Sequence, residues 1–203
     1  MKKIVVILMI IVPLITIQAQ TPLTQENIND IPQKHLKFMG IEMGGNFDDF
    51  IKVLEKKGLK YCEVGSDDNL TVLQGEFAGT DDCMVMVDRS SDKCVTTVGV
   101  GFPLRDSWKM IYSDYFAIKN LLIKKYGNSY DSEELFEGYE PNSDNLRMAM
   151  LKSGRCKYST MFLFVEGSIS IRIMGSYDDC CVTLTYQDAI SAKEKEDKAM
   201  DDL

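Results

Sequence analysis

Hydrophobic residues recur with helical spacing in two stretches of the chain, and each stretch ends in a lysine pair close to a glycine. Asn46, an effective helix cap, precedes the first stretch, and Gly58 follows it. The residues spaced as one buried helix face are Phe47, Phe50, Ile51 and Leu54 in the first stretch and Ile111, Tyr115, Ile118 and Leu122 in the second. The pattern predicts a helix over residues 47–57 and a longer helix over residues 107–126.

Short runs with strand-like patterns follow each predicted helix. Turn-forming residues separate these runs, and Glu166-Gly167 is typical of a two-residue hairpin turn. The predicted strands are residues 59–64, 70–78, 83–88 and 94–102 after the first helix, and residues 147–152, 156–165, 168–175 and 180–187 after the second. A further short strand is expected at residues 36–41, ahead of the first helix.

The same order of helix and strands occurs twice, which indicates an internal duplication. The positions matched at one constant offset are Phe47, Phe50, Leu54, Lys56 and Lys57 with Tyr115, Ile118, Leu122, Lys124 and Lys125. The alternative is a chance similarity of two amphipathic helices. We expect an α+β fold of tandem helix-plus-four-stranded antiparallel sheet units, residues 36–103 and 104–187, in one compact domain, residues 36–187. Two such sheets, each with helices on one face, would leave the other face exposed.

The start of the chain has the pattern of a signal peptide. Lys2 and Lys3 precede an apolar run over residues 4–17, and Ala19 follows as a small residue suited to cleavage. A membrane anchor is the alternative, but the run is shorter than the roughly 20 apolar residues that span a bilayer. We therefore predict a signal peptide at residues 1–19 and an exported protein, periplasmic or secreted, with no stable membrane insertion after cleavage.

Polar segments flank the predicted domain on both sides. Residues 20–35 contain Pro22 and Pro32 and are expected to form a flexible leader. Residues 188–203 are rich in charge and are expected to form a C-terminal helix or tail.

The charge balance is acidic, with 31 Asp and Glu against 23 Lys and Arg and a formal net charge of -8. Cleavage after Ala19 would remove Lys2 and Lys3 and make the protein more acidic still. An acidic surface repels the phosphates of nucleic acids and of anionic lipids. No nucleic acid is therefore expected as a partner, and another protein is the expected one.

The cysteines are even in number, which in an exported chain favours structural disulfides. They are Cys62, Cys83, Cys94, Cys156, Cys180 and Cys181. Their spacing does not choose among the many pairings. No CxxC motif occurs, and the only histidine, His35, lies outside any cysteine cluster, so neither a zinc site nor another cofactor is expected.

The sequence offers little for catalysis. A Ser-His-Asp triad would have to use His35, on the predicted flexible leader, and no phosphate-binding glycine motif occurs. Asp-Asp pairs occur five times, at positions 48–49, 67–68, 81–82, 178–179 and 201–202. Most of them fall at predicted turns or at a helix start, where Asp is favoured for local reasons. Two alternatives remain open: a hydrolase with two acids in a cleft, and stabilisation by calcium.

Residues 128–145 are unusual because they combine acids and aromatic residues without a Lys or Arg. The interaction candidates in this predicted loop are Tyr130, Phe136, Tyr139, Glu133, Glu134 and Glu137. Aromatic residues anchor many protein interfaces, and acids around them steer basic partners. The alternative is a surface excursion whose aromatics pack into the core.

Methionines occur in two pairs with strand spacing, Met84 with Met86 and Met148 with Met150. Such pairs serve either as core fillers or as an adaptable binding surface. We expect core fillers here.

Two resemblances arise from these segments. HLKFMGIEMGGNFDDFIKVLEKKGLKY (35–61), YFAIKNLLIKKYG (115–127), RCKYSTMF (155–162) and the C-terminal DDL resemble a group of uncharacterised exported proteins of anaerobic Gram-negative gut bacteria. The arrangement of helix and sheet is similar to the β-lactamase inhibitor protein fold and to the small SmpA-type outer-membrane assembly lipoproteins. Residues 40–58 resemble the opening turn and helix of the unit that these lipoproteins use. The lipoprotein cysteine is missing here. The second resemblance implies a binding surface on a sheet.

These observations lead to one functional expectation. We expect an exported, non-catalytic binding or inhibitor-like module that uses an exposed sheet face and the 128–145 segment. The alternative is a carboxylate-based hydrolase acting on envelope or dietary glycan.

Overall fold

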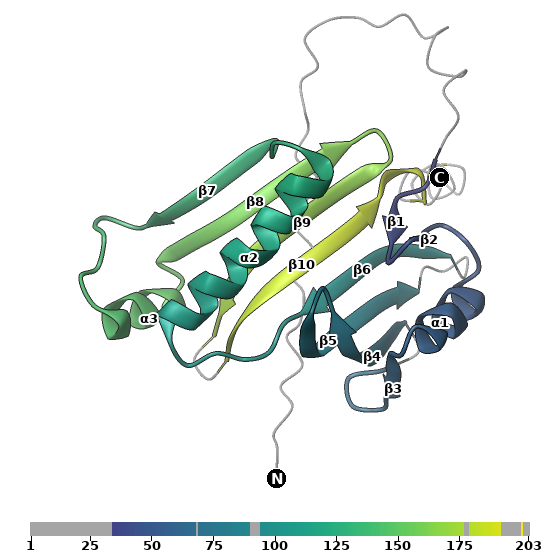
Figure 1. Cartoon of the computed structure of the whole chain (residues 1–203), viewed down its shortest axis with the longest axis horizontal. Helices are drawn as coiled ribbons and strands as arrows, with labels where there is room; N and C mark the ends of the chain where they lie inside the picture. Colours follow the sequence, from purple (N-terminus) through teal and green to yellow (C-terminus); the bar gives the residue numbers. More distant parts are fainter. Residues whose placement is uncertain (1–33, 68, 90–93, 177–178, 192–199, 201–203) are drawn as a thin grey trace, which may run out of the picture.

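The computed structural model describes residues 34–67, 69–89, 94–176, 179–191 and 200, and Figure 1 shows the fold. The first half of the chain contains β1 (Lys37–Phe38), β2 (Ile41–Glu42), α1 (Phe47–Lys56), β3 (Lys60–Cys62), β4 (Leu70–Phe77), β5 (Thr80–Arg89) and β6 (Val95–Gly101). The second half contains α2 (Trp108–Tyr126), β7 (Asp131–Phe136), α3 (Asp144–Lys152), β8 (Cys156–Phe164), β9 (Gly167–Gly175) and β10 (Cys180–Asp188). The predicted signal peptide, almost all of the predicted leader and most of the charged C-terminal segment lie outside the described residues.

The main sheet is antiparallel throughout and runs in the order β3-β4-β5-β6-β10-β9-β8-β7. Each half of the chain contributes four strands that follow one another as a meander. The last strands of the two halves, β6 and β10, pair with each other, with Val98 opposite Tyr186 and Val100 opposite Leu184. The α+β class is therefore confirmed, but the expectation of two separate sheets is wrong: the halves share one continuous sheet of eight strands.

Helices α2 and α3 pack on one face of this sheet, and the buried side chains of α1 belong to the same core. Helix α2 contacts β9 and β10, and α3 contacts β8 and β9, as Figure 1 shows for the second half of the sheet. The strand residues on this face alternate with those on the other, and they are almost fully buried: Val85, Val87, Val98, Val100, Ile169, Ile171 and Leu184. We call this side of the sheet the helix face.

Both predicted helices are present, and their apolar stripes pack into the core. The Asn46 side chain accepts a hydrogen bond of 3.1 Å from the Asp49 N–H and caps α1. The stripe residues Phe47, Phe50 and Leu54 of α1 and Ile111, Tyr115, Ile118 and Leu122 of α2 are all buried. None of the helices in the described part of the chain combines the length and the hydrophobicity that a membrane span requires.

The predicted strand at residues 147–152 is wrong, because this segment belongs to α3. Ser143 caps the helix by accepting a hydrogen bond from the Leu146 N–H. Met148, Met150 and Leu151 are buried, so this methionine pair fills the core from a helix rather than from a strand. The strand of the second half that the prediction missed is β7, within the expected 128–145 loop.

Two turns also differ in detail from the prediction. The expected strand at residues 36–41 is two short strands, β1 and β2, joined by a turn. Phe164 pairs with Gly167, so the turn between β8 and β9 is Val165-Glu166 rather than Glu166-Gly167. A Cβ on Gly167 would lie 2.1 Å from the Gln187 carbonyl oxygen, and its φ is +150°, so only glycine fits there.

The structure contains no disulfide bond among the cysteines, all of which lie in the described part. The expectation of structural disulfides is therefore not met. Cys156 and Cys180 lie on β8 and β10, with β9 between them, and two strand spacings of about 4.8 Å exceed the reach of a disulfide. Cys62 and Cys83 are likewise separated by β4. Cys180 and Cys181 are neighbours on one strand, so their side chains point to opposite faces.

Candidate functional site

The face of the main sheet opposite the helices is covered by no helix or strand of the described chain. On β9, Ile169, Ile171 and Ile173 are buried on the helix face, so the residues between them point to the other side. We call this side the open face. Its central residues are Met84 and Met86 of β5, Thr97, Gly99 and Gly101 of β6, Thr183 and Thr185 of β10, Ser168, Ser170, Arg172 and Met174 of β9, and Ser159 and Met161 of β8.

The strand register arranges these residues in rows that cross the join between the two halves. One row contains Met86, Gly99, Thr185, Ser170 and Met161, and the next contains Met84, Gly101, Thr183, Arg172 and Ser159. Hydroxyl groups and glycines form the middle of the first row, which has a methionine at each end. The second row has a methionine only at its β5 end, with Arg172 on β9 and Ser159 on β8. The open face is therefore polar at its centre, with flexible apolar side chains at Met84 and Met86 of β5 and at Met161 of β8.

Arg172 is the charged residue in the middle of the open face. Its cross-strand neighbours, Thr183 on β10 and Ser159 on β8, carry no charge. The Nε atom is buried and has no hydrogen-bond partner among the described residues. A buried guanidinium nitrogen without a partner is uncommon in native structures, and a carboxylate is the group that fits it best.

The structure divides the three aromatic candidates of the 128–145 segment into two kinds. Tyr130 and Tyr139 are 65% and 55% exposed and lie just before and just after β7. Phe136 is only 7% exposed, and its ring centroid lies 4.9 Å from that of Trp108 and 5.8 Å from that of Tyr158. Phe136 is therefore a core residue, which corrects its place among the interaction candidates.

The acidic candidates also separate by face. Glu133 points to the side of the open face, and its Oε1 lies 3.5 Å from Lys157 Nζ. Glu137 follows β7, and its Oε2 lies 3.5 Å from Arg155 Nε. Both pairs are largely exposed, so they contribute little to stability. Glu134 points instead to the helix face, where it joins a hydrogen-bond network.

This network fixes β7 to α2 and β8, and sequence reasoning missed it. The Tyr115 hydroxyl lies 2.6 Å from Thr160 Oγ1 and donates to Glu134 Oε1 at 3.0 Å. Lys119 forms an ion pair with the same carboxylate and donates to Ser132 Oγ at 3.0 Å. Burial alone would raise the pKa of Glu134, but the hydrogen bonds from Lys119 and Tyr115 outweigh it and lower that pKa below its usual value.

Ser132 and Lys119 lie as close together as a serine nucleophile and a lysine base, but they are not arranged to act as such a pair. A lysine base must be free to accept a proton from the serine. Lys119 instead donates to both Glu134 and Ser132. The arrangement therefore supports a structural role for the network.

His35 is not part of a flexible leader, as the sequence suggested, but is tied to the domain. Its Nδ1 lies 2.9 Å from Asp188 Oδ2, which also accepts a hydrogen bond of 2.8 Å from Ser191 Oγ. A catalytic triad requires the histidine between the serine and the acid. Here the acid lies between the other two, so the cluster is not arranged as a triad.

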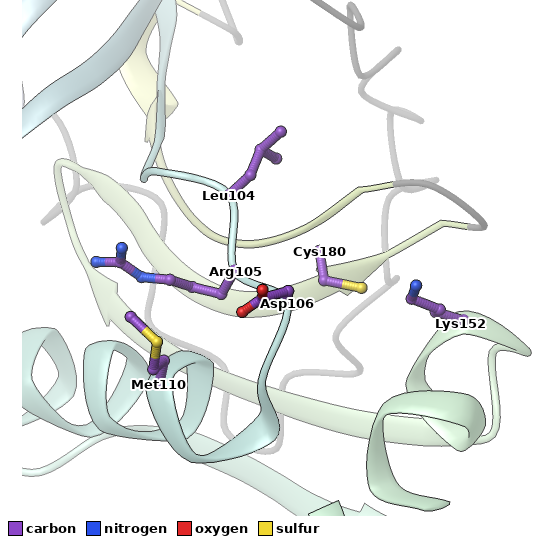
Figure 2. A pocket seen from close by; sticks show the side chains of 6 residues that line it. All are labelled: Leu104, Arg105, Asp106, Met110, Lys152 and Cys180. Carbon is purple, nitrogen blue, oxygen red and sulfur yellow. The ribbon is translucent and has the colours of Figure 1, made fainter. Parts of the chain in front are cut away.

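One cavity lies beside the start of β10 and another beside β3. The first, of about 300 Å³, is shown in Figure 2 and is lined by Leu104, Arg105, Asp106, Met110, Lys152 and Cys180. The second, of about 480 Å³, is lined by Gly58, Lys60, Tyr61, Cys62, Gln74, Gly75 and Asp82. Each cavity has one carboxylate, Asp106 in the first and Asp82 in the second. Neither brings together the two acids that glycoside hydrolysis needs.

The thiol in the first cavity is not set up as a nucleophile. Figure 2 shows the Cys180 side chain and the Lys152 amine pointing toward each other. Burial raises the pKa of Cys180, and Lys152 opposes this only in part. A thiol must lose its proton to react, so the cavity does not favour cysteine catalysis.

Among the acid pairs, Asp67 has a local structural explanation, whereas Asp179 is buried and its Oδ2 has no hydrogen-bond partner among the described residues. Asp67 Oδ1 accepts hydrogen bonds from the N–H groups of Asn69 and Leu70, at 2.7 and 2.8 Å, and shapes the turn before β4. Asp81 and Asp82 belong to β5 rather than to a turn. Within the described ranges, no three His, Cys, Asp or Glu side chains gather as a metal site.

Comparison of the chain with protein-family models, with curated proteins and with solved structures gave no match.

Proposed function

We propose that the protein is an exported, non-catalytic binding module and that the open face is its binding surface for another protein. The observation that carries this proposal is Arg172, whose buried Nε has no partner among the described residues, in the middle of a sheet face that no described element covers. A partner that places a carboxylate against the guanidinium would satisfy Nε with a charge-assisted hydrogen bond when the Arg172 side chain turns this buried atom toward the partner.

The composition of the open face supports a protein as the partner. Small side chains at Gly99, Gly101 and Ser170 leave room for a partner to approach the sheet closely. Met84 and Met86 flank the site of Gly101, where their atoms lie 3.8 to 3.9 Å from the position of a Cβ. Methionine and arginine are enriched in the cores of protein interfaces, and methionine adapts its shape to a partner.

The chain topology supports the resemblance to the β-lactamase inhibitor protein fold, which we propose as the closer description of the architecture. Each half supplies a helix followed by strands, and the two meanders join into one antiparallel sheet with helices on one face. A likeness of fold implies a sheet surface suited to binding and does not identify the partner. The two cavities favour no hydrolase, so we propose no second function.

Site-specific crosslinking tests the binding surface. A photoreactive residue replaces Ser170 on the open face or, as the matched control, Lys124 on the exposed side of α2, and the protein is irradiated in its host. We expect a crosslinked protein from position 170 and none from position 124. We also expect Arg172→Glu to abolish the crosslink and Lys56→Glu, a change at an exposed position of α1, to leave it unchanged.

Two results would count against the proposal. Crosslinks of equal yield from both positions, or none from position 170, would show that the open face is not the binding surface.

The export step has its own test, because cleavage after Ala19 predicts Gln20 as the first residue of the protein in the envelope or medium. A first residue of Met1 would contradict it.

A further inference from the structure

Strand β7 forms a free edge of the main sheet. It pairs with β8 on one side, and no described strand pairs with it on the other. Asp131, Ser132, Glu133 and Leu135 are exposed, so the edge is accessible to solvent. The opposite edge, β3, has only three residues, whereas β7 has six and could pair along its length of about 20 Å.

The backbone groups of alternate β7 residues point away from the sheet. The N–H of Glu137, just after β7, donates to the Arg155 carbonyl at 2.9 Å. In an antiparallel pair, residues that exchange hydrogen bonds with the neighbouring strand alternate with residues that do not. The register therefore directs the N–H and C=O groups of Ser132, Glu134 and Phe136 toward the free edge. The Ser132 N–H donates there to Asp131 Oδ1 at 2.9 Å, so an added strand has to displace that side chain to pair with it.

Side-chain contacts on the helix face hold the strand in an extended conformation. Glu134 and Ser132 are fixed from the helix side by Lys119, and Phe136 is packed against Trp108. A strand that is already ordered loses little conformational entropy when a second strand adds to it. The network on the helix face thus prepares β7 as a template for strand pairing.

Natural proteins protect such edges with Pro, Lys, bulges or charged side chains, and β7 has only charged side chains. It contains no Pro, no Lys and no bulge in its pairing with β8. Three of its residues are acidic, Asp131, Glu133 and Glu134. Like charges in opposite strands are destabilising, so the acids disfavour pairing of β7 with a second copy of itself.

The negative charges of Asp131 and Glu133 favour an added strand that carries Lys or Arg. Side chains of an added strand would lie beside Asp131 and Glu133, where cross-strand pairs with Lys or Arg are favourable. Asp131 forms no ion pair among the described residues, and the pair of Glu133 with Lys157 is long and exposed. Tyr130 and Tyr139 lie exposed at the two ends of the strand and are available as aromatic contacts.

We propose that β7 binds an extended, lysine- or arginine-bearing segment of a partner protein, which adds to the sheet as a ninth strand. This inference goes beyond the proposed function of the open face, because it uses different residues, a different type of contact and a partner segment of opposite charge.

Synthetic peptides of about eight residues, slightly longer than β7, test this proposal. The probe alternates lysine with threonine and carries a fluorophore, and its binding to the purified protein is followed by anisotropy. Two further peptides carry N-methyl groups on alternate residues, one set on each edge of the extended chain. We expect one methylation pattern to abolish binding and the other to leave it unchanged, because only one edge of the peptide faces β7.

Protein variants test the charge preference. We expect the double variant Asp131→Lys, Glu133→Lys to weaken binding of the lysine peptide by at least about tenfold and to favour a matched glutamate peptide. Glu55→Lys on exposed α1 is the control and should change little. Arg172→Glu should also leave peptide binding unchanged, which separates this proposal from that for the open face.

Three outcomes would overturn the proposal. They are equal loss of binding with both methylation patterns, unchanged binding by the double variant, and no binding of the lysine peptide at all. Self-association of the protein that is lost in the Asp131→Lys, Glu133→Lys variant would assign the edge to a second copy of the chain and would also overturn it.

Discussion

The buried carboxylate of Asp188 joins His35 and Leu36, before the first strand, to Ser191, just after the last strand. Its side chain is fully buried, and it accepts hydrogen bonds from the Leu36 N–H at 2.7 Å and from the Ser191 N–H at 2.9 Å. His35 and the Ser191 hydroxyl complete the set. Burial alone would raise the pKa of Asp188, but these hydrogen bonds outweigh it and lower that pKa below its usual value.

Replacing Asp188 tests how much this carboxylate stabilises the fold. We expect Asp188→Ala to lower the free energy of unfolding by about 2 to 4 kcal/mol, because it leaves buried donors without an acceptor. Urea denaturation measures the change. Asp106→Ala, at an exposed position, is the control and should cost less than about 0.5 kcal/mol. Equal effects of the two substitutions would contradict a central role for Asp188.

The lowered pKa also predicts a pH dependence. A carboxylate with a folded-state pKa below its unfolded value stabilises the protein above the unfolded value of about 3.9. That contribution is lost as the pH falls through the folded-state pKa. We therefore expect the stability difference between the wild type and Asp188→Asn, measured by urea denaturation, to shrink steadily below about pH 4. A difference that stayed constant down to pH 2 would contradict the lowered pKa.

At the scale of the elements, the residue patterns predict buried helices well and exposed edges poorly. Helix α1 is predictable because Asn46 caps it and its stripe of Phe47, Phe50 and Leu54 repeats at the helical period. Strand β7 has no such pattern, because Asp131 and Glu133 face solvent and Glu134 forms an ion pair with Lys119 of α2. The run at residues 147–152 alternates like a strand but is helical, because tertiary packing of its buried residues decides its conformation.

The candidate sites show the same limit. The acids and aromatics of residues 128–145 are visible in the sequence, but their division between the core and the edge depends on the pairing of β7 with β8. The position of Arg172 on the open face follows from strand alternation once β9 is known. Its lack of a partner among the described residues does not follow, because that depends on which strands lie beside β9.

The contact between α3 and β9 can be tested with one glycine. A Cβ on Gly175 would lie 2.6 Å from Leu151 Cγ, so Leu151 fills the space that the glycine leaves. We expect Gly175→Ala to destabilise the protein by about 1 to 3 kcal/mol through overpacking, and Leu151→Ala by about 2 to 5 kcal/mol through a cavity. Denaturation of the double variant should show a loss smaller than the sum, because the new methyl group occupies part of the cavity. Simple additivity would contradict the contact.

At the scale of the whole molecule, the pairing of β6 with β10 makes the two halves depend on each other. An aromatic cluster reinforces this join. The ring centroid of Phe38 lies 5.4 Å from that of Phe77 on β4 and 5.2 Å from that of Tyr186 on β10. Neither half can separate from the other without exposing these rings and the apolar strand residues between them, which is costly in water.

This dependence predicts that the two halves unfold in one transition. Trp108 is the only tryptophan, so its fluorescence reports on the second half, while amide exchange of β4 and β5 reports on the first. We expect both signals to change at the same urea concentration. Leu184→Ala, which opens a cavity at the join, should shift both curves to lower urea by the same amount, equivalent to about 2 to 5 kcal/mol. The control is Ala117→Ser, at an exposed position of α2, which should shift neither curve appreciably. If the fluorescence of Trp108 changed first and the first half kept its protection, the halves would be separate domains that merely share a hydrogen-bonded edge.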